Sequence, residues 1–180
     1  MSLANKISIF RVLLAPALIA CFVYYAPTRE WLRWAALTLF LIGMASDALD
    51  GLIARRHNQQ TELGTLLDPL ADKALILSAL ISCSVIRGLP DALRIPAWFN
   101  LVVISRDVLV LTGSIILFLI KGKWHVRPSQ LGKWATCSQM IVIPAVLLGL
   151  PMKEPLIVIA AALTVISAIT YVRMSIRVLS

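Results

Sequence analysis

Residues 31–57 read WLRWAALTLFLIGMASDALDGLIARRH, and residues 66–86 read LLDPLADKALILSALISCSVI. Each stretch is mostly apolar, and each carries two aspartates toward the end nearer the other stretch. A helix of about 20 apolar residues is long enough to cross a bilayer. An ionised carboxylate inside such a helix costs about 2.5–3.5 kcal/mol, so acidic residues there indicate function by default. The two stretches therefore predict membrane helices that hold a polar site.

The composition of the whole chain indicates that the bilayer is its solvent. Of 180 residues, 59% are hydrophobic and 14% are charged, and the mean hydropathy is +0.88. Soluble domains carry about 25% charged residues. The net charge is +8, and the basic residues occur singly or in pairs between apolar runs. Proteins that bind nucleic acid usually carry their basic residues in a continuous cluster, which this sequence does not have. We expect one membrane domain over residues 1–180, in contact with the lipid bilayer, and no nucleic-acid partner.

Six apolar stretches are long enough to be membrane spans, and glycine or proline marks the joints between them, including Gly64. Lys6 and the apolar run that follows it resemble a cleavable signal peptide. Because the apolar run continues to Tyr25, we expect a membrane span there instead. The predicted fold class is all-α, a polytopic membrane protein with six transmembrane helices. The expected spans are residues 7–26, 31–54, 66–86, 95–120, 136–150 and 156–172, with a start near 131 as the alternative for the fifth.

The basic residues of the loops and helix ends predict the direction of the spans. Six spans place both termini on the same side of the membrane, and the side richer in Lys and Arg is cytoplasmic. That side has ten such residues against five, so both termini are expected to be cytoplasmic. The ten are Lys6, Arg11, Arg55, Arg56, Lys121, Lys123, Arg127, Lys133, Arg173 and Arg177, and the five are Arg29, Arg33, Arg87, Arg94 and Lys153.

The four aspartates are spaced to form a site. Asp47 and Asp50 are three residues apart and Asp68 and Asp72 are four apart, so each pair projects from one face of its helix. If the two faces oppose each other, the carboxylates converge. A cluster of acceptor oxygens suits hard cations such as Mg²⁺ or Mn²⁺. The spacing therefore predicts a divalent-metal site at the cytoplasmic ends of these helices.

Small and basic residues surround the aspartates. Gly51, Ala54 and Gly64 leave the backbone bare where a ligand could approach. Arg55 stands where its guanidinium could clamp a diphosphate. Pro69 is best tolerated in a first helical turn, so we expect the third span's helix to begin close to Asp68.

These residues resemble a known family signature. Eight fixed positions over 26 residues match that of the CDP-alcohol phosphotransferases (CDP-alcohol phosphatidyltransferases) without departure in type or spacing: Asp47-x2-Asp50-Gly51-x2-Ala54-Arg55-x8-Gly64-x3-Asp68-x3-Asp72. The six-span length also resembles the family. The run from Leu67 to Lys73 is similar to the corresponding run in one branch of the family. The enzymes of that branch make phosphatidylglycerophosphate or, in the mitochondrial-type enzymes, cardiolipin.

The resemblance implies a metal-dependent enzyme of phospholipid biosynthesis with CDP-diacylglycerol as donor. It implies two divalent ions, Mg²⁺ or Mn²⁺, with Asp72 also acting as general base. It further implies a homodimer in a bacterial inner membrane or its equivalent, with the active site on the cytoplasmic side. The implied metal residues are Asp47, Asp50, Asp68 and Asp72, and those implied for the cytidine nucleotide and diphosphate are Gly51, Ala54, Arg55 and Gly64.

Basic residues elsewhere are candidates for an acceptor that carries a phosphate. Arg106 and Asp107 fall in the middle of the fourth span, where Arg106 either pairs with neighbours or binds the acceptor phosphate. Lys133, Arg127 and Lys123 are further candidates, although a basic cytoplasmic loop is also what topology alone predicts. Such residues favour glycerol 3-phosphate as the acceptor.

Other functions remain open from the sequence. Phosphatidylglycerol, the acceptor in cardiolipin synthesis, also carries a phosphate. The pair Arg106-Asp107 resembles the cardiolipin synthase branch more than the phosphatidylglycerophosphate synthase branch, which usually has Arg-Glu at these positions. A cation or proton transporter could use the aspartates as a relay, but the chain has no internal repeat of the kind many transporters show. A noncatalytic scaffold would have little reason to keep four carboxylates in the bilayer.

Overall fold

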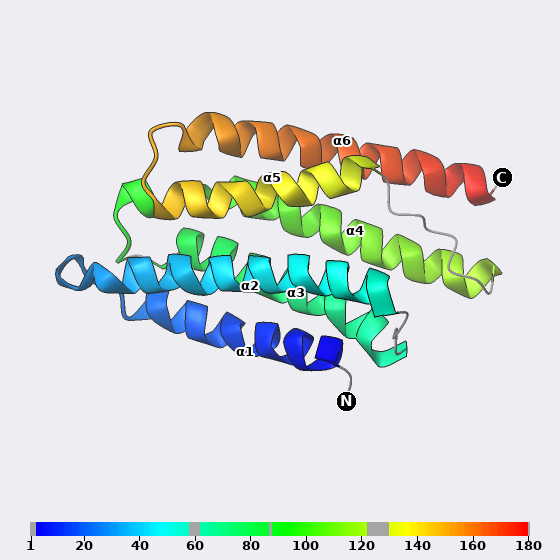
Figure 1. Cartoon of the computed structure of the whole chain (residues 1–180). Helices are drawn as coiled ribbons and strands as arrows, with labels where there is room; N and C mark the ends of the chain where they lie inside the picture. Colours follow the sequence, from blue (N-terminus) through cyan, green and yellow to red (C-terminus); the bar gives the residue numbers. More distant parts are fainter. Residues whose placement is uncertain (1–2, 58–61, 87, 122–129, 180) are drawn as a thin grey trace. The chain divides into compact units, whose positions relative to one another are not determined.

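A computed structural model of the chain describes residues 3–57, 62–86, 88–121 and 130–179, with side chains for residues 9–46, 73–86, 88–117, 119–120 and 130–176. Within these ranges the chain forms six α-helices and two short 3₁₀ helices (Figure 1). The expected all-α fold with six helices is confirmed. The helices fall into two compact units, unit 1 (Met1–Ile95 and Val146–Gly149) and unit 2 (Pro96–Ala145 and Leu150–Ser180).

Unit 1 is built on three helices, and α1 packs closely against both of the others. The chain reverses direction after α1 and again after α2. The N-terminus of α1, the C-terminus of α2 and the N-terminus of α3 therefore lie at the same end of unit 1 (Figure 1). The elements are α1 (Leu3–Val23), η1 (Pro27–Arg29), α2 (Trp31–His57), α3 (Glu62–Val85) and η2 (Asp91–Leu93).

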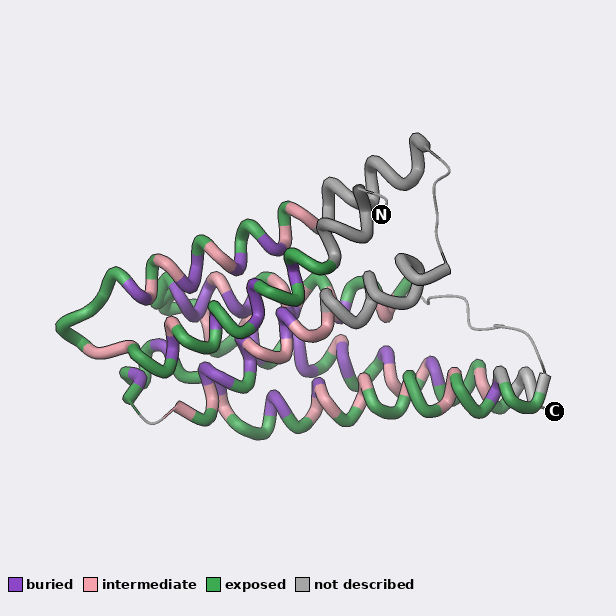
Figure 2. Tube along the Cα trace, turned by 90° about the horizontal axis from the view of Figure 1, so that it is seen from below, coloured by how far each residue is buried: buried purple, intermediate pink, exposed green. Residues whose placement is uncertain are grey.

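The helices of unit 1 bury side chains at helical spacing. Figure 2 shows buried positions recurring along the described helices, with exposed positions between them. This pattern produces one buried stripe on each helix, directed at its neighbours. The buried side chains include Arg11, Leu14, Leu18 and Phe22 in α1, Leu32, Ala36, Leu37 and Phe40 in α2, and Leu75, Ile76, Ala79, Leu80 and Cys83 in α3.

Gly43 lets α2 and α3 approach closely. A Cβ atom at this position would lie 2.2 Å from Leu75 Cδ2 and 3.7 Å from Leu14 Cδ1. Leu14 and Leu75 are both buried, so they leave little room for an added methyl group. Leu14, Gly43 and Leu75 therefore define one packing layer in which all three helices of unit 1 meet.

Unit 2 contains α4 (Ala97–Lys121), most of α5 (Gln130–Leu147) and α6 (Lys153–Leu179). The helix α4 packs against α6. The helix α5 ends at a glycine cap, because Gly149 has φ +66° and its N–H donates to Val146 O at 2.9 Å, while Leu150 N–H donates to Ala145 O at 3.0 Å. This pair of bonds satisfies carbonyls that the helix end leaves without partners.

Polar side chains on one stripe of α6 join the helices of unit 2. Thr164 accepts a hydrogen bond from Gln139 Nε2 of α5 at 3.1 Å. Tyr171 Oη and Ser114 Oγ of α4 lie 3.1 Å apart, and the ring of Tyr171 occupies the space beside Gly113. Polar contacts of this kind hold helices together where lipid offers no partner.

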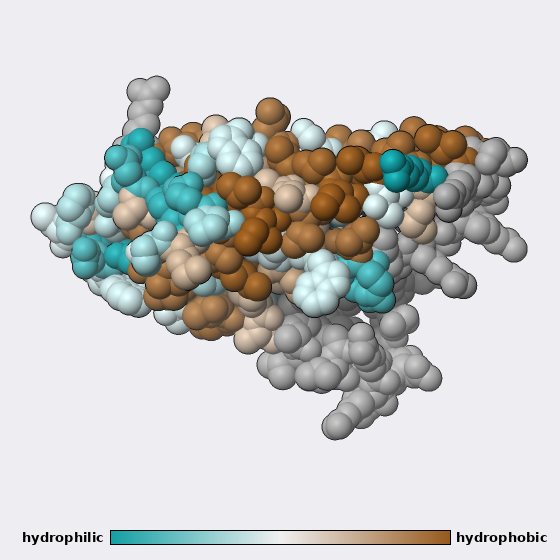
Figure 3. Space-filling model, turned by 90° about the horizontal axis from the view of Figure 1, so that it is seen from above, coloured by the Kyte–Doolittle hydropathy of each residue, from teal (hydrophilic) through white to brown (hydrophobic). Residues whose placement is uncertain are grey.

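The described part of the chain has the apolar surface expected of a membrane protein. Two helical segments, Asp91–Leu117 and Lys153–Ile176, are long and apolar enough to cross a membrane by length and composition. Hydrophobic side chains gather on the face shown in Figure 3. Large apolar side chains are exposed in both units, including Leu13 (64%), Val85 (68%), Leu101 (68%) and Leu119 (75%). Such surface is costly in water and normal in lipid.

The layer around Gly43 predicts that this position does not accept a larger residue. Alanine would gain about 1 kcal/mol in helix propensity, but overpacking a core costs about 1–3 kcal/mol. We expect Gly43→Ala to lower the stability of the purified protein by about 1–2 kcal/mol, measured by thermal unfolding in detergent micelles. Leu75→Ala removes the clashing methyl, so the double variant should lose less than the sum of the two single losses.

Gly88→Ala is the matched control, since a Cβ there would meet only Tyr25 O at 3.9 Å. Its stability should stay within about 0.5 kcal/mol of the parent. A Gly43→Ala protein as stable as the parent would show that the α2–α3 contact is looser than described.

Candidate active site

The four aspartates lie on two helices of unit 1 that share an end. Asp47 and Asp50 are in the C-terminal half of α2, and Asp68 and Asp72 are in the first half of α3. These helix ends are the ones that lie together in Figure 1. The side chains of residues 47–72 are outside the described part of the structure, so their convergence stays a prediction. What the backbone establishes is that both pairs are helical and near the same end.

The start of α3 differs from the expectation drawn from Pro69. The helix begins at Glu62, not close to Asp68, so Gly64 lies in its first turn and is not a joint between spans. A proline removes one backbone N–H bond, and a membrane helix can tolerate that loss when local geometry or neighbouring groups satisfy the freed carbonyl. Both aspartates of α3 are therefore held on a regular helix, four residues apart on one face.

The layer of Leu14, Gly43 and Leu75 lies just below the aspartates. Asp47 is four residues beyond Gly43, and Asp72 is three residues before Leu75. At 1.5 Å per residue, both positions are about one helical turn above the layer. Because Gly43 brings α2 and α3 close together there, the two carboxylate-bearing segments start from closely spaced backbones.

This donor set fits a divalent metal. Carboxylates at i, i+3 on one helix and i, i+4 on the next supply only oxygen ligands, which Mg²⁺ and Mn²⁺ prefer. Among the side chains that the structure describes, no group of three or more His, Cys, Asp and Glu residues could hold a metal. The residues at which the sequence predicts the metal lie outside that set.

The predicted nucleotide residues share the aspartate helices. Gly51, Ala54 and Arg55 follow Asp50 in the last two turns of α2, and Gly64 is in the first turn of α3. Their side chains are also outside the described part of the structure. The bare backbone of these residues and the aspartates therefore occupy the same two helix ends, as a nucleotide-metal site requires.

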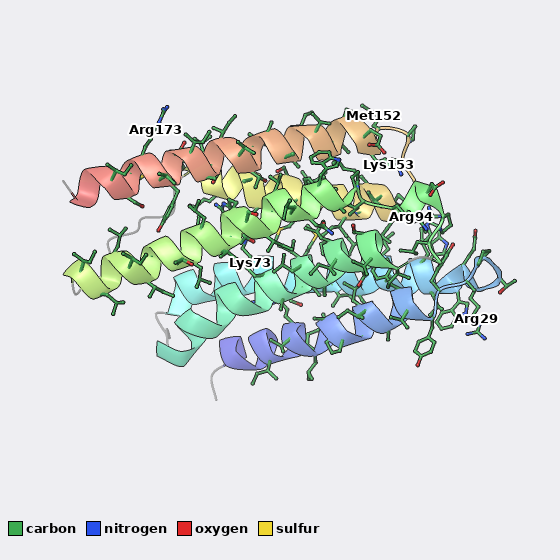
Figure 4. All side chains as sticks on the ribbon, turned by 180° about the vertical axis from the view of Figure 1, so that it is seen from behind. Arg29, Lys73, Arg94, Met152, Lys153 and Arg173 are labelled. Atoms are coloured by element: carbon green, nitrogen blue, oxygen red, sulfur yellow. The ribbon has the colours of Figure 1, made fainter. Side chains whose placement is uncertain are left out.

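Arg11 is placed differently from the sequence interpretation. The sequence places it among the cytoplasmic cations of loops and helix ends, but it lies inside α1 and is only 1% exposed. The remaining cations of unit 1 with described side chains agree better with the prediction, since Arg29 and Arg94 lie at the opposite end from the aspartates (Figure 4). Lys73 is half-buried along α3.

Arg106 forms specific contacts inside unit 2. Its Nη1 donates to Asp107 Oδ1 at 2.9 Å and its Nη2 donates to Ser167 Oγ of α6 at 3.0 Å. The two charged side chains are 11% and 13% exposed. The Arg106 Nε atom is buried without a hydrogen-bond partner. The pairing expected of intramembrane charges is therefore present, and one donor of the guanidinium is left over.

Arg106 also borders an apolar groove between α4 and α6. The groove has a volume of about 320 Å³, and Ser105, Leu109, Val165 and Ile169 line it with Arg106. Sequence reasoning missed the α6 wall of this groove, and it also missed Ser167, which bonds Arg106 from α6. The signal was present in the spacing of Thr164, Ser167 and Tyr171, three polar-tipped residues on one face of an apolar helix.

The other predicted acceptor residues are less defined. Lys133 is exposed in the first turn of α5. The Gln139–Thr164 bond sets the register of α5 against α6. By this register, Lys133 lies about one helical turn away from the level of Ser167, toward the N-terminus of α5. Lys123 and Arg127 fall within residues 122–129, outside the described part of the structure.

Comparison with known proteins agrees with the motif. Residues 1–170 match the family model described as CDP-alcohol phosphatidyltransferase. The chain is 33% identical over 148 residues to the CDP-diacylglycerol–glycerol-3-phosphate 3-phosphatidyltransferase of Cereibacter sphaeroides, covering 82% of this chain and 64% of that protein. This chain therefore spans less than two thirds of that relative's length.

Two further relatives cover both branches of the predicted function. A protein named "Probable phosphatidylglycerophosphate synthase" from Mycobacterium tuberculosis is 33% identical over 184 residues, covering 98% of this chain and 82% of that protein. The cardiolipin synthase (CMP-forming) of Streptomyces coelicolor is 39% identical over 118 residues, covering 64% and 50%.

The family match extends from the first residue through most of α6, and it includes every position of the eight-residue motif. The resemblance proposed from Asp47 to Asp72 is confirmed, and with it the class of enzyme at the level of the family. The chain belongs to the CDP-alcohol phosphatidyltransferase family.

Proposed function

We propose that this protein transfers the phosphatidyl group of CDP-diacylglycerol to the hydroxyl of glycerol 3-phosphate, giving phosphatidylglycerophosphate and CMP. The observation that carries the proposal is the complete eight-position motif on α2 and α3 of a chain that matches the family over residues 1–170. The C. sphaeroides relative is named for this reaction. The acting unit is a single membrane domain of residues 1–180, assembled as a homodimer.

The proposed reaction follows from the charges involved. Asp47, Asp50, Asp68 and Asp72 would hold two divalent ions, Mg²⁺ or Mn²⁺, which when bound would supply charge neutralisation for the diphosphate and for the departing CMP. The Asp72 carboxylate takes the proton from the attacking hydroxyl. Gly51, Ala54 and Gly64 leave room for the nucleotide, and Arg55 binds the diphosphate.

The proposed membrane arrangement has six spans with both termini and the active site on the cytoplasmic side. It is supported by cations and aromatic residues at the helix ends. Trp31, Trp34 and Trp134 are 65%, 52% and 64% exposed, as expected of rings at a membrane interface. Basic residues also stand at the ends of α6 in unit 2. Lys153 is at the start of this helix, and Arg173 is near its other end and points away from the helix (Figure 4).

The proposed acceptor site uses Arg106 and Lys133, with Lys123 and Arg127 from the loop before α5. The unused Nε donor of Arg106 supports this role, because a buried donor without a partner is costly until a ligand satisfies it. Phosphatidylglycerol is the second candidate acceptor, favoured by the 39% identity to a cardiolipin synthase. Both acceptors carry the phosphate that these cations suit.

Replacing Asp72 by asparagine should abolish the reaction while the protein stays folded. A general base contributes about 10²–10⁴-fold, and the change also removes a metal ligand. We expect CMP release from CDP-diacylglycerol and glycerol 3-phosphate with Mg²⁺ to fall at least about a hundredfold. Asp91→Asn, the same change at a carboxylate that is 98% exposed, is the control and should be fully active. Turnover retained in Asp72→Asn would remove this residue as the base.

A panel of acceptors separates the proposed function from its rivals. The purified protein, given CDP-diacylglycerol and Mg²⁺, should release CMP with glycerol 3-phosphate and not with phosphatidylglycerol, serine or inositol. Release with phosphatidylglycerol alone would make the protein a cardiolipin synthase. Cation or proton movement across sealed vesicles without nucleotide, and no CMP release with any alcohol, would indicate a transporter.

Arg106 should affect the acceptor more than the donor. A charge-assisted hydrogen bond contributes about 1.5–3 kcal/mol, so Arg106→Gln should lower kcat/KM for glycerol 3-phosphate by about 10–100-fold. The KM for CDP-diacylglycerol should change little. Ser167→Ala removes one contact of the same guanidinium and is the control, with an expected loss below about threefold. Equal losses in the two variants, or equal losses for both substrates, would assign Arg106 to helix packing.

A further inference from the structure

Arg11 is the most deeply buried charged side chain that the structure describes. Its exposure is 1%, and the neighbours on its stripe of α1 are Leu14, Ala15 and Leu18. That stripe faces α2 and α3, the two helices that α1 contacts. The guanidinium is therefore enclosed by unit 1 itself and does not reach toward a membrane surface from a helix end.

Enclosing a guanidinium requires negative charge nearby. The effective cost of burying an unpaired ion in a protein is several kcal/mol, and arginine stays protonated rather than giving up its charge. The described residues that form the layer below it, Leu14, Gly43 and Leu75, are apolar. The compensating charge must come from the other direction along the helices.

The packing layer gives the level of Arg11 along unit 1. Arg11 is three residues before Leu14, about 4.5 Å toward the N-terminus of α1. In the same direction, Asp47 lies four residues beyond Gly43 on α2, about 6 Å, and Asp72 lies three residues before Leu75 on α3, about 4.5 Å. All three helices have this end in common (Figure 1). Arg11, Asp47 and Asp72 therefore occupy one level of the three-helix unit, one turn from a layer whose contacts are known.

The other basic residues of unit 1 with described side chains are not fully buried at the level of Asp47 and Asp72. Arg33 donates to Leu147 O, and Arg94 donates to Leu89 O, both at other levels. Arg29 is exposed at the turn between α1 and α2. Lys73 follows Asp72 on α3, but it is only half-buried. Among the described side chains of unit 1, Arg11 alone is fully buried and charged.

We propose that Arg11 is a positioning residue whose guanidinium is the resident counter-cation of the aspartate cluster, at the level of Asp47 and Asp72. This inference rests on the proposed metal-dependent function and adds a residue of α1 to a site otherwise built from α2 and α3. Before metal binds, the cation offsets repulsion among the carboxylates and holds the two helix ends together. After metal binds, the cluster depends on it less, because the metal ions supply the positive charge.

Thermal unfolding of the full-length protein in detergent micelles tests this with no turnover involved. The variants are Arg11→Met, which removes the charge, Arg11→Lys, which keeps it, and Leu14→Ala, which removes packing one turn away on the same stripe. Each is measured in chelator and in excess Mg²⁺. In chelator, Arg11→Met should unfold roughly 5–10 °C below the parent. In Mg²⁺ this deficit should shrink by at least about half, because metal binding stabilises the variant more than the parent.

The controls distinguish a charge effect from a packing effect. Leu14→Ala should lose the same amount in chelator and in Mg²⁺, and Arg11→Lys should retain most of the parent's stability in both. An Arg11→Met deficit that is equal in the two conditions would overturn the proposal. The same holds if Arg11→Lys is as destabilised as Arg11→Met.

A double variant keeps the test decisive if Arg11→Met does not fold. Removing one negative charge from the level of Arg11 should compensate for losing the cation, so Arg11→Met combined with Asp47→Asn or with Asp72→Asn should give folded protein. Recovery with neither would overturn the proposal. A protein that releases CMP while failing these tests would retain its proposed function and lose only this role of Arg11.

Discussion

The architecture depends on the cost of keeping carboxylates within apolar helices. Each of Asp47, Asp50, Asp68 and Asp72 would be expensive alone in a bilayer, and the chain pairs them at helical spacing on two consecutive helices. The glycine at position 43 lets those helices meet one turn away, against Leu75. Close packing on one side and positive charge on the other are the conditions under which such a cluster is stable. In the proposed enzyme the positive charge comes from divalent ions and from Arg11.

In unit 2, the charged side chain of Arg106 lies within apolar helices and is stabilised by direct contacts with neighbouring side chains. Arg106 contacts Asp107 and Ser167, and further polar contacts join α6 to α4 and α5 at Tyr171 and Thr164. These bonds fix the helices through one polar stripe on α6. Ser167 of this stripe accepts a hydrogen bond from Arg106, which lines the groove between α4 and α6, so the stripe that joins the helices of unit 2 also fixes the position of the proposed phosphate-binding cation.

Sequence patterns predicted the helices and the family because both depend on local spacing. Six apolar stretches gave six helices, and the aspartate motif identified the family. Two errors came from features that spacing does not encode. Arg11 looked like a surface cation near a chain end, and only packing of α1 against two helices reveals that it is buried. Pro69 suggested a helix start, but α3 extends back to Glu62, since one missing backbone donor does not stop a membrane helix.

Binding of Mn²⁺ to the purified protein, followed by electron paramagnetic resonance, tests most directly whether the four carboxylates form one site. We predict two ions per chain with a spectrum showing magnetic coupling, as for ions about 3.5–4 Å apart, and loss of that coupling in Asp50→Asn. A single uncoupled ion, or two coupled ions that persist when Asp50 and Asp68 are both replaced by asparagine, would contradict the account.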